Sequence, residues 1–408
     1  MAASKEQNFI SPLAPTLRRR VADYLGLERN VAVVSAAVFL MGLGEELWKK
    51  FLPKYLERLG AGPVVIGLFG TTEDFFDAIY QYPGGWLADR AGRRRAFFVF
   101  IGIASIGYLI YLLSPTWPWV FVGLGFAMAW HSMASPAIFA VIGDALPREK
   151  RAMGFTLQSI LKRVPMVVSP LAGGAVIAAV GISAGVRAGL AVTLVLALVT
   201  ALIVRVLNIR VKQDEAINIR GVWRSFHVSL KRLLVSDIII RTCEGMADIF
   251  VILYVTNVLR LSVARYGLLV AIQITTSILI YIPAGKIADR TGRKPFVIAT
   301  FVCFALFPLA VALSSGFASL FIAFIIGGLR EIGEPARKAM IVDFAQDGVR
   351  ARSVGLYYLI RSITITPSAA IGGLLWRLAP QVPFITAGLI GLVGALVFAI
   401  TVEERYAS

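Results

Sequence analysis

The chain alternates between long apolar runs and short loops in which charged residues gather. Crossing a bilayer takes roughly 20 mostly apolar residues, and twelve runs approach that length. The pattern therefore predicts an all-α integral membrane protein with twelve transmembrane helices in two six-helix bundles. The predicted spans are 31–53, 64–87, 96–113, 118–143, 153–178, 186–204, 234–256, 266–287, 296–313, 317–343, 353–376 and 382–401.

A single polar connection is long enough to divide the chain into halves. The predicted parts are a cytoplasmic N-terminal segment (1–30), an N-terminal bundle (31–204), a cytoplasmic inter-domain loop (205–233), a C-terminal bundle (234–401) and a cytoplasmic tail (402–408).

Composition agrees with a membrane protein and argues against other classes. The 408 residues are 58% hydrophobic and 16% charged, and their mean hydropathy is +0.77. The net charge of +17 does not indicate a nucleic-acid partner, because the charges flank apolar runs and form no basic domain. No zinc pattern, P-loop or nucleophile elbow is present, so we expect neither an enzyme nor a metal or other cofactor. Cys243 and Cys303 lie in apolar runs, and no disulfide framework is expected.

The distribution of Lys and Arg predicts the orientation. The seven segments that would face one side hold 25 of these residues, and the six loops on the other side hold 5. Positive residues remain on the cytoplasmic side of a membrane. We therefore expect a multi-pass protein of the cell (inner) membrane with both termini in the cytoplasm, and we expect a monomer.

A charged hairpin occurs twice, at residues 84–95 (GGWLADRAGRRR) and 284–295 (AGKIADRTGRKP). Asp89 and Asp289 are 200 positions apart, which is half the chain and indicates an internal duplication. The spacing G-x-L-A-D-R-x-G-R-R resembles the loop signature of the major facilitator superfamily of secondary transporters. The resemblance implies two pseudo-symmetric six-helix bundles that work by alternating access. It also implies that the first, fourth, seventh and tenth helices line a central cavity.

Four spans carry several charges each on one helical face, although a charge at bilayer depth costs about 3 kcal/mol or more. Such side chains should face protein or water, so these faces predict a shared aqueous path. They contain Glu45, Glu46 and Lys49; Glu73, Asp74 and Asp77; Arg241, Glu244 and Asp248; and Arg330, Glu331, Glu334, Arg337 and Lys338.

The acidic members are candidates for proton coupling, because burial of a carboxylate disfavours its charged form. The candidates are Glu45, Glu46, Glu244 and Asp248, together with Glu73, Asp74 and Asp77. A proton gradient is then the expected energy source. The alternative is a set of fixed salt bridges, Glu45 with Lys49 or Lys49 with Asp248. For the acids of the second span, the alternative partners are Lys162, Arg163 and Arg361.

Arg330, with Glu331 and Glu334, is the leading candidate for orienting a substrate, because a guanidinium matches a carboxylate or phosphate. An internal Arg–Glu pair within one helix turn is the alternative. His131 and Trp130 lie mid-span and are further ligand candidates, or else they are packed residues.

The repeated hairpins are candidates for gating. In the superfamily that the chain resembles, the motif aspartate meets the N-terminal end of the eleventh helix, where a carboxylate is stabilised by the helix dipole. Arg93 is expected to pair with Asp144, and the mirror pair is Arg293 with Asp343. Such bonds would latch the outward-facing state, whereas the alternative is that the charges only set topology. The gating candidates are Asp89, Arg90, Gly92, Arg93, Asp144, Asp289, Arg293 and Asp343.

The fifth span contains Pro170, Gly173 and Gly174, which are expected to bend the helix and allow close packing. The segment resembles the antiporter signature G-x-x-x-G-P-x-x-G-G in part, which favours proton-driven export of a small organic molecule. The internal repeat is an alternative explanation, because Gly372 and Gly373 follow Pro367 in the second half.

Other functions remain open at this point. Proton symport of an organic anion would use Arg330 with Lys162, Arg163 and Arg361. A lipid or lysolipid flippase, a nutrient sensor and a membrane enzyme are further alternatives. The substrate is not identified, and a cation, an anion or a zwitterion would each fit.

Overall fold

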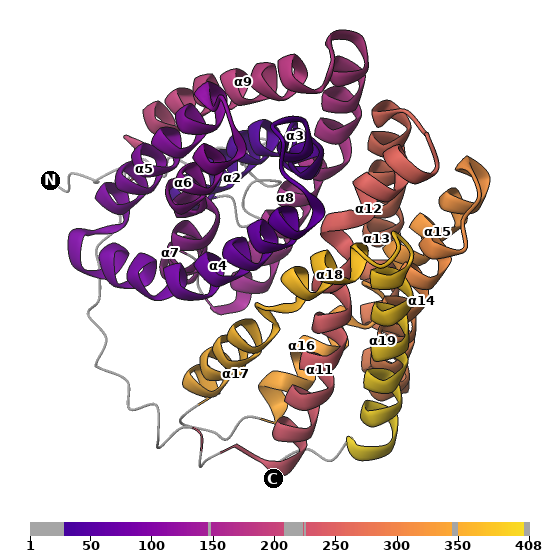
Figure 1. Ribbon diagram of the computed structural model, residues 1–408. Coiled ribbons are helices and arrows are strands. Elements are labelled where there is room, and N and C mark those ends of the chain that lie inside the picture. Colours follow the sequence, from indigo (N-terminus) through magenta and orange to yellow (C-terminus); the bar gives the residue numbers. More distant parts are fainter. Residues whose placement is uncertain (1–27, 146–147, 208–222, 224–225, 345–349, 404–408) are drawn as a thin grey trace, which may run out of the picture.

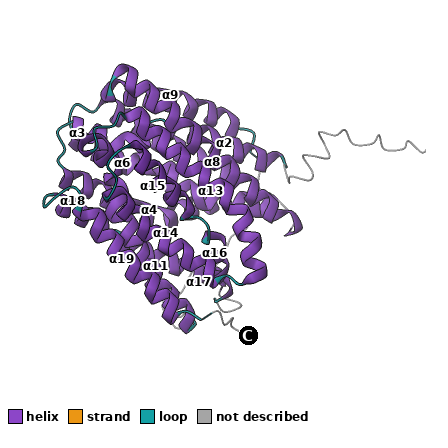
Figure 2. Ribbon diagram, turned by 90° about the vertical axis from the view of Figure 1, so that its right-hand side faces the viewer, coloured by secondary structure: helices purple, strands orange, loops and turns teal. Residues whose placement is uncertain are grey.

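The computed structural model describes residues 28–145, 148–207, 223, 226–344 and 350–403. Every regular element in these ranges is helical, and the helices fall into two groups that lie side by side (Figures 1 and 2). The N-terminal group, coloured indigo to magenta in Figure 1, consists of α2 (Arg29–Glu45), η1 (Lys49–Phe51), α3 (Leu52–Arg58), α4 (Pro63–Ala91), α5 (Arg93–Leu113), α6 (Trp117–Met128), η2 (Ala129–Met133), α7 (Ala134–Ala145), α8 (Arg148–Val180) and α9 (Ile182–Val204).

The C-terminal group is coloured from salmon to yellow in Figure 1. It consists of α11 (Val228–Ala247), η3 (Asp248–Phe250), α12 (Val251–Leu253), η4 (Tyr254–Val258), α13 (Val263–Thr291), α14 (Lys294–Ala312), α15 (Phe317–Leu329), α16 (Glu334–Asp343), α17 (Arg350–Ile365), α18 (Ser368–Trp376) and α19 (Val382–Thr401).

Within the described residues, eight helical segments are long and apolar enough to cross a membrane. The other predicted spans are 64–87, 118–143, 234–256 and 317–343. Three of them are interrupted helices: 118–143, 234–256 and 317–343. Several charged side chains lie in 64–87, 234–256 and 317–343. Helices that line a polar interior differ in this way from helices that face lipid, because charge at bilayer depth must face protein or water.

Helix interruptions occur at corresponding places in the two halves. In the first span α2 ends at Glu45 and the 3₁₀ turn η1 follows, and in the seventh span α11 gives way to η3 at Asp248. In the fourth span the π-turn η2 begins at Ala129, and in the tenth α15 ends at Leu329. The expectation of regular helix through the first, seventh and tenth charged faces is therefore wrong. Non-helical backbone is tolerated at membrane depth where it is buried in protein or lines a cavity.

The two halves meet along two helix pairs, α8 with α13 and α4 with α18. Small residues allow this close approach. A Cβ atom on Gly67 would lie 2.4 Å from the carbonyl oxygen of Ala369, and one on Gly267 would lie 2.4 Å from that of Pro170. The contacts leave no room for a side chain at either glycine.

The predicted helix-bending residues lie in α8, which continues from Arg148 to Val180 across Pro165 and Pro170. A Cβ atom on Gly173 would lie 2.0 Å from the carbonyl oxygen of Leu47, and one on Gly174 would lie 3.3 Å from that of Val263. These glycines therefore permit close packing, one within the N-terminal half and one against the C-terminal half.

Candidate functional site

A cavity of about 760 Å³ lies between the two halves. Residues from both halves line it, including ten of the predicted site residues: Glu45, Glu46, Glu73, Asp74, Trp130, His131, Glu244, Asp248, Arg330 and Glu331. Of the predicted proton-coupling and substrate-binding residues, only Asp77 and Glu334 are described by the structure but are not part of the lining. The cavity is therefore a polar chamber, as the charged helix faces predicted.

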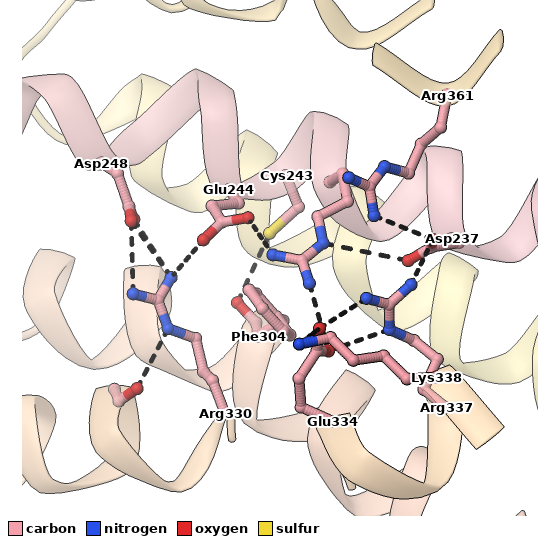
Figure 3. Close-up of polar contacts among 12 residues, drawn as sticks. Asp237, Cys243, Glu244, Asp248, Phe304, Arg330, Glu334, Arg337, Lys338 and Arg361 are labelled. Carbon is pink, nitrogen blue, oxygen red and sulfur yellow. Dashed lines mark hydrogen bonds and ion pairs between the residues drawn. The ribbon is translucent and has the colours of Figure 1, made fainter. Parts of the chain in front are cut away.

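On the C-terminal wall, ion pairs follow one another along α11 (Figure 3). Both guanidinium Nη atoms of Arg330 lie 3.2 Å from the Asp248 carboxylate, and Arg330 lies 3.7 Å from Glu244. Glu244 in turn accepts a 2.7 Å hydrogen bond from Arg241. The Arg330 guanidinium also lies 5.0 Å from the ring centre of Phe304. Glu244 and Asp248, predicted to carry protons, are thus both held by arginine in this state.

Glu334 extends this network from Arg241 to Arg337 and Lys338 (Figure 3). It accepts hydrogen bonds of 2.9 and 2.6 Å from Arg337 and one of 3.3 Å from Arg241. Arg330 is paired with Asp248 and Glu244, whereas Glu334 binds other arginines. The predicted cluster of Arg330 with Glu331 and Glu334 is therefore not formed in this state.

Asp237 is the centre of the network and was not predicted as a site residue. It is fully buried, with 0% of the residue exposed. It accepts hydrogen bonds of 2.6 Å from Arg337, 2.9 Å from the Tyr357 hydroxyl and 3.4 Å from Arg361. These bonds join α11 to α16 and α17. A sequence signal existed, because Asp237 lies in an apolar run four residues before Arg241, on the same helical face.

The N-terminal wall has fewer internal ion pairs. The Lys49 ammonium lies 3.4 Å from Glu73, and the Tyr108 hydroxyl donates a 2.5 Å hydrogen bond to Glu45. The alternatives that paired Lys49 with Glu45 or with Asp248 are not seen. Periodicity could place Lys49 on the cavity face but could not identify the neighbouring helix that supplies its partner.

Four charged residues on this wall have neither an ion-pair nor a hydrogen-bond partner within the described part of the chain: Glu46, Lys50, Asp74 and Lys162. Glu46 is only 8% exposed, and its Oε2 atom is enclosed. Asp77, one helical turn beyond Asp74, accepts a 2.6 Å hydrogen bond from Ser132. The alternative that paired the second-span acids with Lys162, Arg163 or Arg361 is therefore not seen for Asp74 or Asp77.

The two aromatic ligand candidates lie on the π-turn η2 and differ in exposure. His131 lines the cavity and interacts electrostatically with Lys49. Trp130 is 5% exposed, and its ring centre lies 6.1 Å from that of Phe97. Trp130 is thus largely a packed residue at the edge of the cavity, whereas His131 faces the polar groups of the N-terminal wall.

One arginine bridges the two halves at the cavity. Arg163 of α8 lies 2.9 Å from Glu331 and donates a 2.8 Å hydrogen bond to Ser277 of α13. Its guanidinium also lies 4.8 Å from the ring centre of Tyr281. Glu331, predicted to orient substrate beside Arg330, therefore bonds across the seam between the halves.

A second bridge, here called the clasp, consists of Lys54 and Glu57 of α3 and Asn257 of η4. Asn257 donates a 2.5 Å hydrogen bond to Glu57, and Lys54 bonds to both residues. The clasp joins the halves at the end of the bundle predicted to face away from the cytoplasm. The clasp could not be predicted from the sequence, because its members lie in segments expected to be short polar loops, 54–63 and 257–265.

At the opposite end, Arg293 forms an ion pair with Asp343. Both residues belong to the C-terminal half, so this bond does not by itself join the halves. Gly92 has φ +85°, a conformation that favours glycine, and Arg90 lies 5.2 Å from the ring centre of Trp86.

The side chains of Asp89, Asp144 and Asp289 lie outside the described residues. Arg93 is 6% exposed at the start of α5. Its pairing with Asp144 and the latch across the halves therefore remain predictions.

Comparisons with known proteins agree with this architecture. The family model described as Major Facilitator Superfamily matches residues 34–240 and 233–408. The "Uncharacterized MFS-type transporter MJ1317" of Methanocaldococcus jannaschii is 22% identical over 386 residues, which cover 91% of this chain and 94% of the relative. The multidrug resistance protein MdtG of Salmonella paratyphi C is 24% identical over 287 residues, or 67% and 70% of the two chains. The structure of the nucleoside transporter NupG superposes with a TM-score of 0.78 at 13% identity, covering 91% of this chain and 100% of that one.

Proposed function

Because the chain belongs to the major facilitator superfamily, we propose that it is a proton-coupled secondary transporter that exports a small organic molecule by alternating access. It is a multi-pass membrane transporter. The coupling ion, the direction, the inner-membrane location and the cytoplasmic position of both termini are parts of the proposal. No cofactor other than the proton gradient is invoked.

The observation that carries the proposal is the position of Asp74. It lies on α4 at the seam between the halves, and its Oδ2 atom is 4.0 Å from where a Cβ atom would lie on Gly245 of α11. The negative charges of Glu73, Asp77 and Glu244 repel the Asp74 carboxylate, and the positive charge of Lys49 attracts it. Glu244 belongs to the opposite half. Neighbouring carboxylates repel one another, and a proton bound to one carboxylate relieves that repulsion. Protonation of Asp74 would therefore change the energy of closing the seam.

The two bridges support a rocking motion of the halves. The clasp joins them at the end predicted to be extracellular, and Arg163 joins them beside the cavity. With the termini in the cytoplasm, this arrangement corresponds to a state closed to the outside. Opening to the outside would break the clasp, and a latch at the hairpins would then form on the cytoplasmic side.

Two observations support export, one from a relative's name and one from the sequence and packing of α8. Relatives such as MdtG of Salmonella paratyphi C carry the name multidrug resistance protein. The segment around Pro170, Gly173 and Gly174 matches the antiporter signature in part, and Gly174 packs at the seam between the halves.

The test uses the full chain reconstituted in liposomes that contain a pH-sensitive dye. Compounds are added one at a time, and those that move protons through the wild type are then tested with Asp74→Asn. We expect the variant to lose compound-driven proton movement while retaining exchange of the same compound across the membrane without a gradient. Glu28→Gln, an exposed change at the start of α2, is the matched control. Unchanged proton movement in Asp74→Asn would refute the coupling assignment.

A further inference from the structure

The charges that line the cavity are unevenly distributed between its walls. On the C-terminal wall, every lining charge in the described residues takes part in an ion pair. These residues are Arg241, Glu244, Asp248, Arg330, Glu331 and Lys338. On the N-terminal wall, five lining charges have no ion-pair partner in the described part: Glu45, Glu46, Lys50, Asp74 and Lys162. Of these, Glu45 accepts a hydrogen bond from Tyr108.

Two of these unpaired groups have opposite sign and share one region of the wall. Glu46 is nine-tenths buried with one carboxylate oxygen enclosed and unpartnered, whereas Lys162 is exposed to the cavity. Lys162 is repelled by Lys49 and attracted by Glu45, Glu46 and Asp77. Its ammonium nevertheless forms no ion pair within 4.0 Å of any of these three carboxylates. The two charges are thus close enough to act on one small molecule and too far apart to neutralise each other directly.

The facing wall offers apolar surface. Ile249, Ile274 and Ile365 line the same cavity and are partly exposed. The aromatic lining residues Tyr266, Phe304, Phe307 and Phe324 lie behind this surface, each at most 6% exposed. Arg330 already covers Phe304 and Phe307, at 5.0 and 4.6 Å from the ring centres. The C-terminal wall therefore offers apolar surface to a ligand, and its own charged side chains are already paired.

Occlusion of the cavity during transport would remove water from the unpaired groups. A buried charge without a partner is strongly unfavourable. A substrate with one charge would compensate Glu46 or Lys162 but leave the other alone. A substrate with both charges would compensate both, and its apolar part would meet the isoleucines of the facing wall.

Building on the proposed transport function, we propose that the substrate is a small amphipathic zwitterion. Its ammonium group binds at Glu46, beside Glu45, and its carboxylate binds at Lys162. Asp74 is left free to exchange the coupling proton.

The test measures binding without any gradient, on the purified full chain in detergent. The probes are matched triplets with a common body: an amino acid, its amide and its N-acetyl derivative, prepared for phenylalanine, leucine and the dipeptide Ala-Phe. These are zwitterion, cation and anion, respectively. We expect at least one zwitterion to bind about tenfold or more tightly than both of its derivatives, because each lost charged hydrogen bond weakens binding on that order.

Charge variants then assign the two ends. Glu46→Gln should weaken the zwitterion and the cation but leave the anion unchanged. Lys162→Gln should weaken the zwitterion and the anion but leave the cation unchanged. Glu28→Gln and Lys231→Gln, which lie outside the cavity lining, are the matched controls and should bind as the parent does.

Three results would overturn the inference. In the first, an amide or an N-acetyl derivative is the tightest binder of every triplet, or no triplet binds. In the second, the two variants weaken all three probes equally. In the third, Glu46→Gln combined with Lys162→Gln binds the zwitterion as well as the parent does. A zwitterion that binds in the crossed pattern but moves no protons in liposomes would refute the proposed coupling and leave this assignment intact.

Discussion

Removing the Asp237 carboxylate should destabilise the C-terminal half more than any surface ion-pair change. Asp237 is fully buried, and its bond to Arg337 is 2.6 Å long. The Arg337 side chain is only 2% exposed, so Asp237→Ala leaves a guanidinium that water cannot reach. Breaking a buried pair by deleting one partner costs about 3–5 kcal/mol. Glu334 retains two hydrogen bonds to Arg337, so we expect the lower end, about 3 kcal/mol.

The assay is thermal unfolding in detergent, followed by reaction of a maleimide dye with Cys243. That thiol is fully buried and reacts only when the half unfolds, and Cys303→Ser removes the second, partly buried thiol. Tyr357→Phe removes one hydrogen bond to Asp237 and should cost about 1 kcal/mol.

The matched control is Asp343→Ala, which breaks the ion pair with Arg293. The Asp343 side chain is 37% exposed, and exposed pairs contribute only about 0–1 kcal/mol. The melting temperature should therefore fall most for Asp237→Ala, less for Tyr357→Phe and least for Asp343→Ala. Equal melting temperatures for the Asp237 and Asp343 variants would refute the reasoning, because burial would then not determine how much an ion pair contributes to stability.

Two further predictions concern the end of the bundle that the clasp closes. Both use a Leu52→Cys variant whose thiol reacts with a membrane-impermeant maleimide. Leu52 is buried and lines the cavity, so the rate of labelling reports opening at this end. Gly67→Ala places a Cβ atom 2.4 Å from the carbonyl oxygen of Ala369, so α4 and α18 must separate and labelling should accelerate severalfold. Asn257→Ala removes the hydrogen bond to Glu57 across the halves and should also accelerate labelling. Unchanged labelling in Gly67→Ala would show that the glycine contact does not limit opening, and unchanged labelling in Asn257→Ala would show the same for the clasp.

Most of the fold could be predicted from the sequence, because the patterns that indicate it are either local or repeated in the two halves. Apolar runs of the right length predict membrane helices, and the 200-residue offset between Asp89 and Asp289 predicts two related halves. The helix interruptions after Glu45 and after Leu329 could not be predicted from the sequence. The backbone N–H groups there bond to nearby carbonyls, as Trp48 does to Glu45, or to another helix, as Gly333 does to the Thr300 hydroxyl. Such breaks also need surrounding protein or a cavity at membrane depth, and both exist only once distant helices have assembled.

The sequence predicted which residues belong to the site but not which of them form hydrogen bonds or ion pairs with one another. Helical periodicity placed Glu45, Lys49 and Arg330 toward the interior, and all three line the cavity. Pairs such as Lys49 with Glu73, or Arg163 with Glu331, join different helices. Periodicity states which face a residue occupies but not which side chain another helix places opposite to it.

The internal repeat explains why the two walls can share a geometry and still differ in chemistry. Lys49 and Asp248 occupy corresponding positions, 199 residues apart, at the same helix interruption. Asp248 is held by Arg330, whereas Lys49 takes its partner from α4 within a wall that still has unpaired charges. A wall whose charges are all paired gains little from binding a proton or an ion, because each pair would have to break first. On the proposed mechanism, the N-terminal half therefore changes its charge state during transport, and the C-terminal half moves as a fixed electrostatic surface against it.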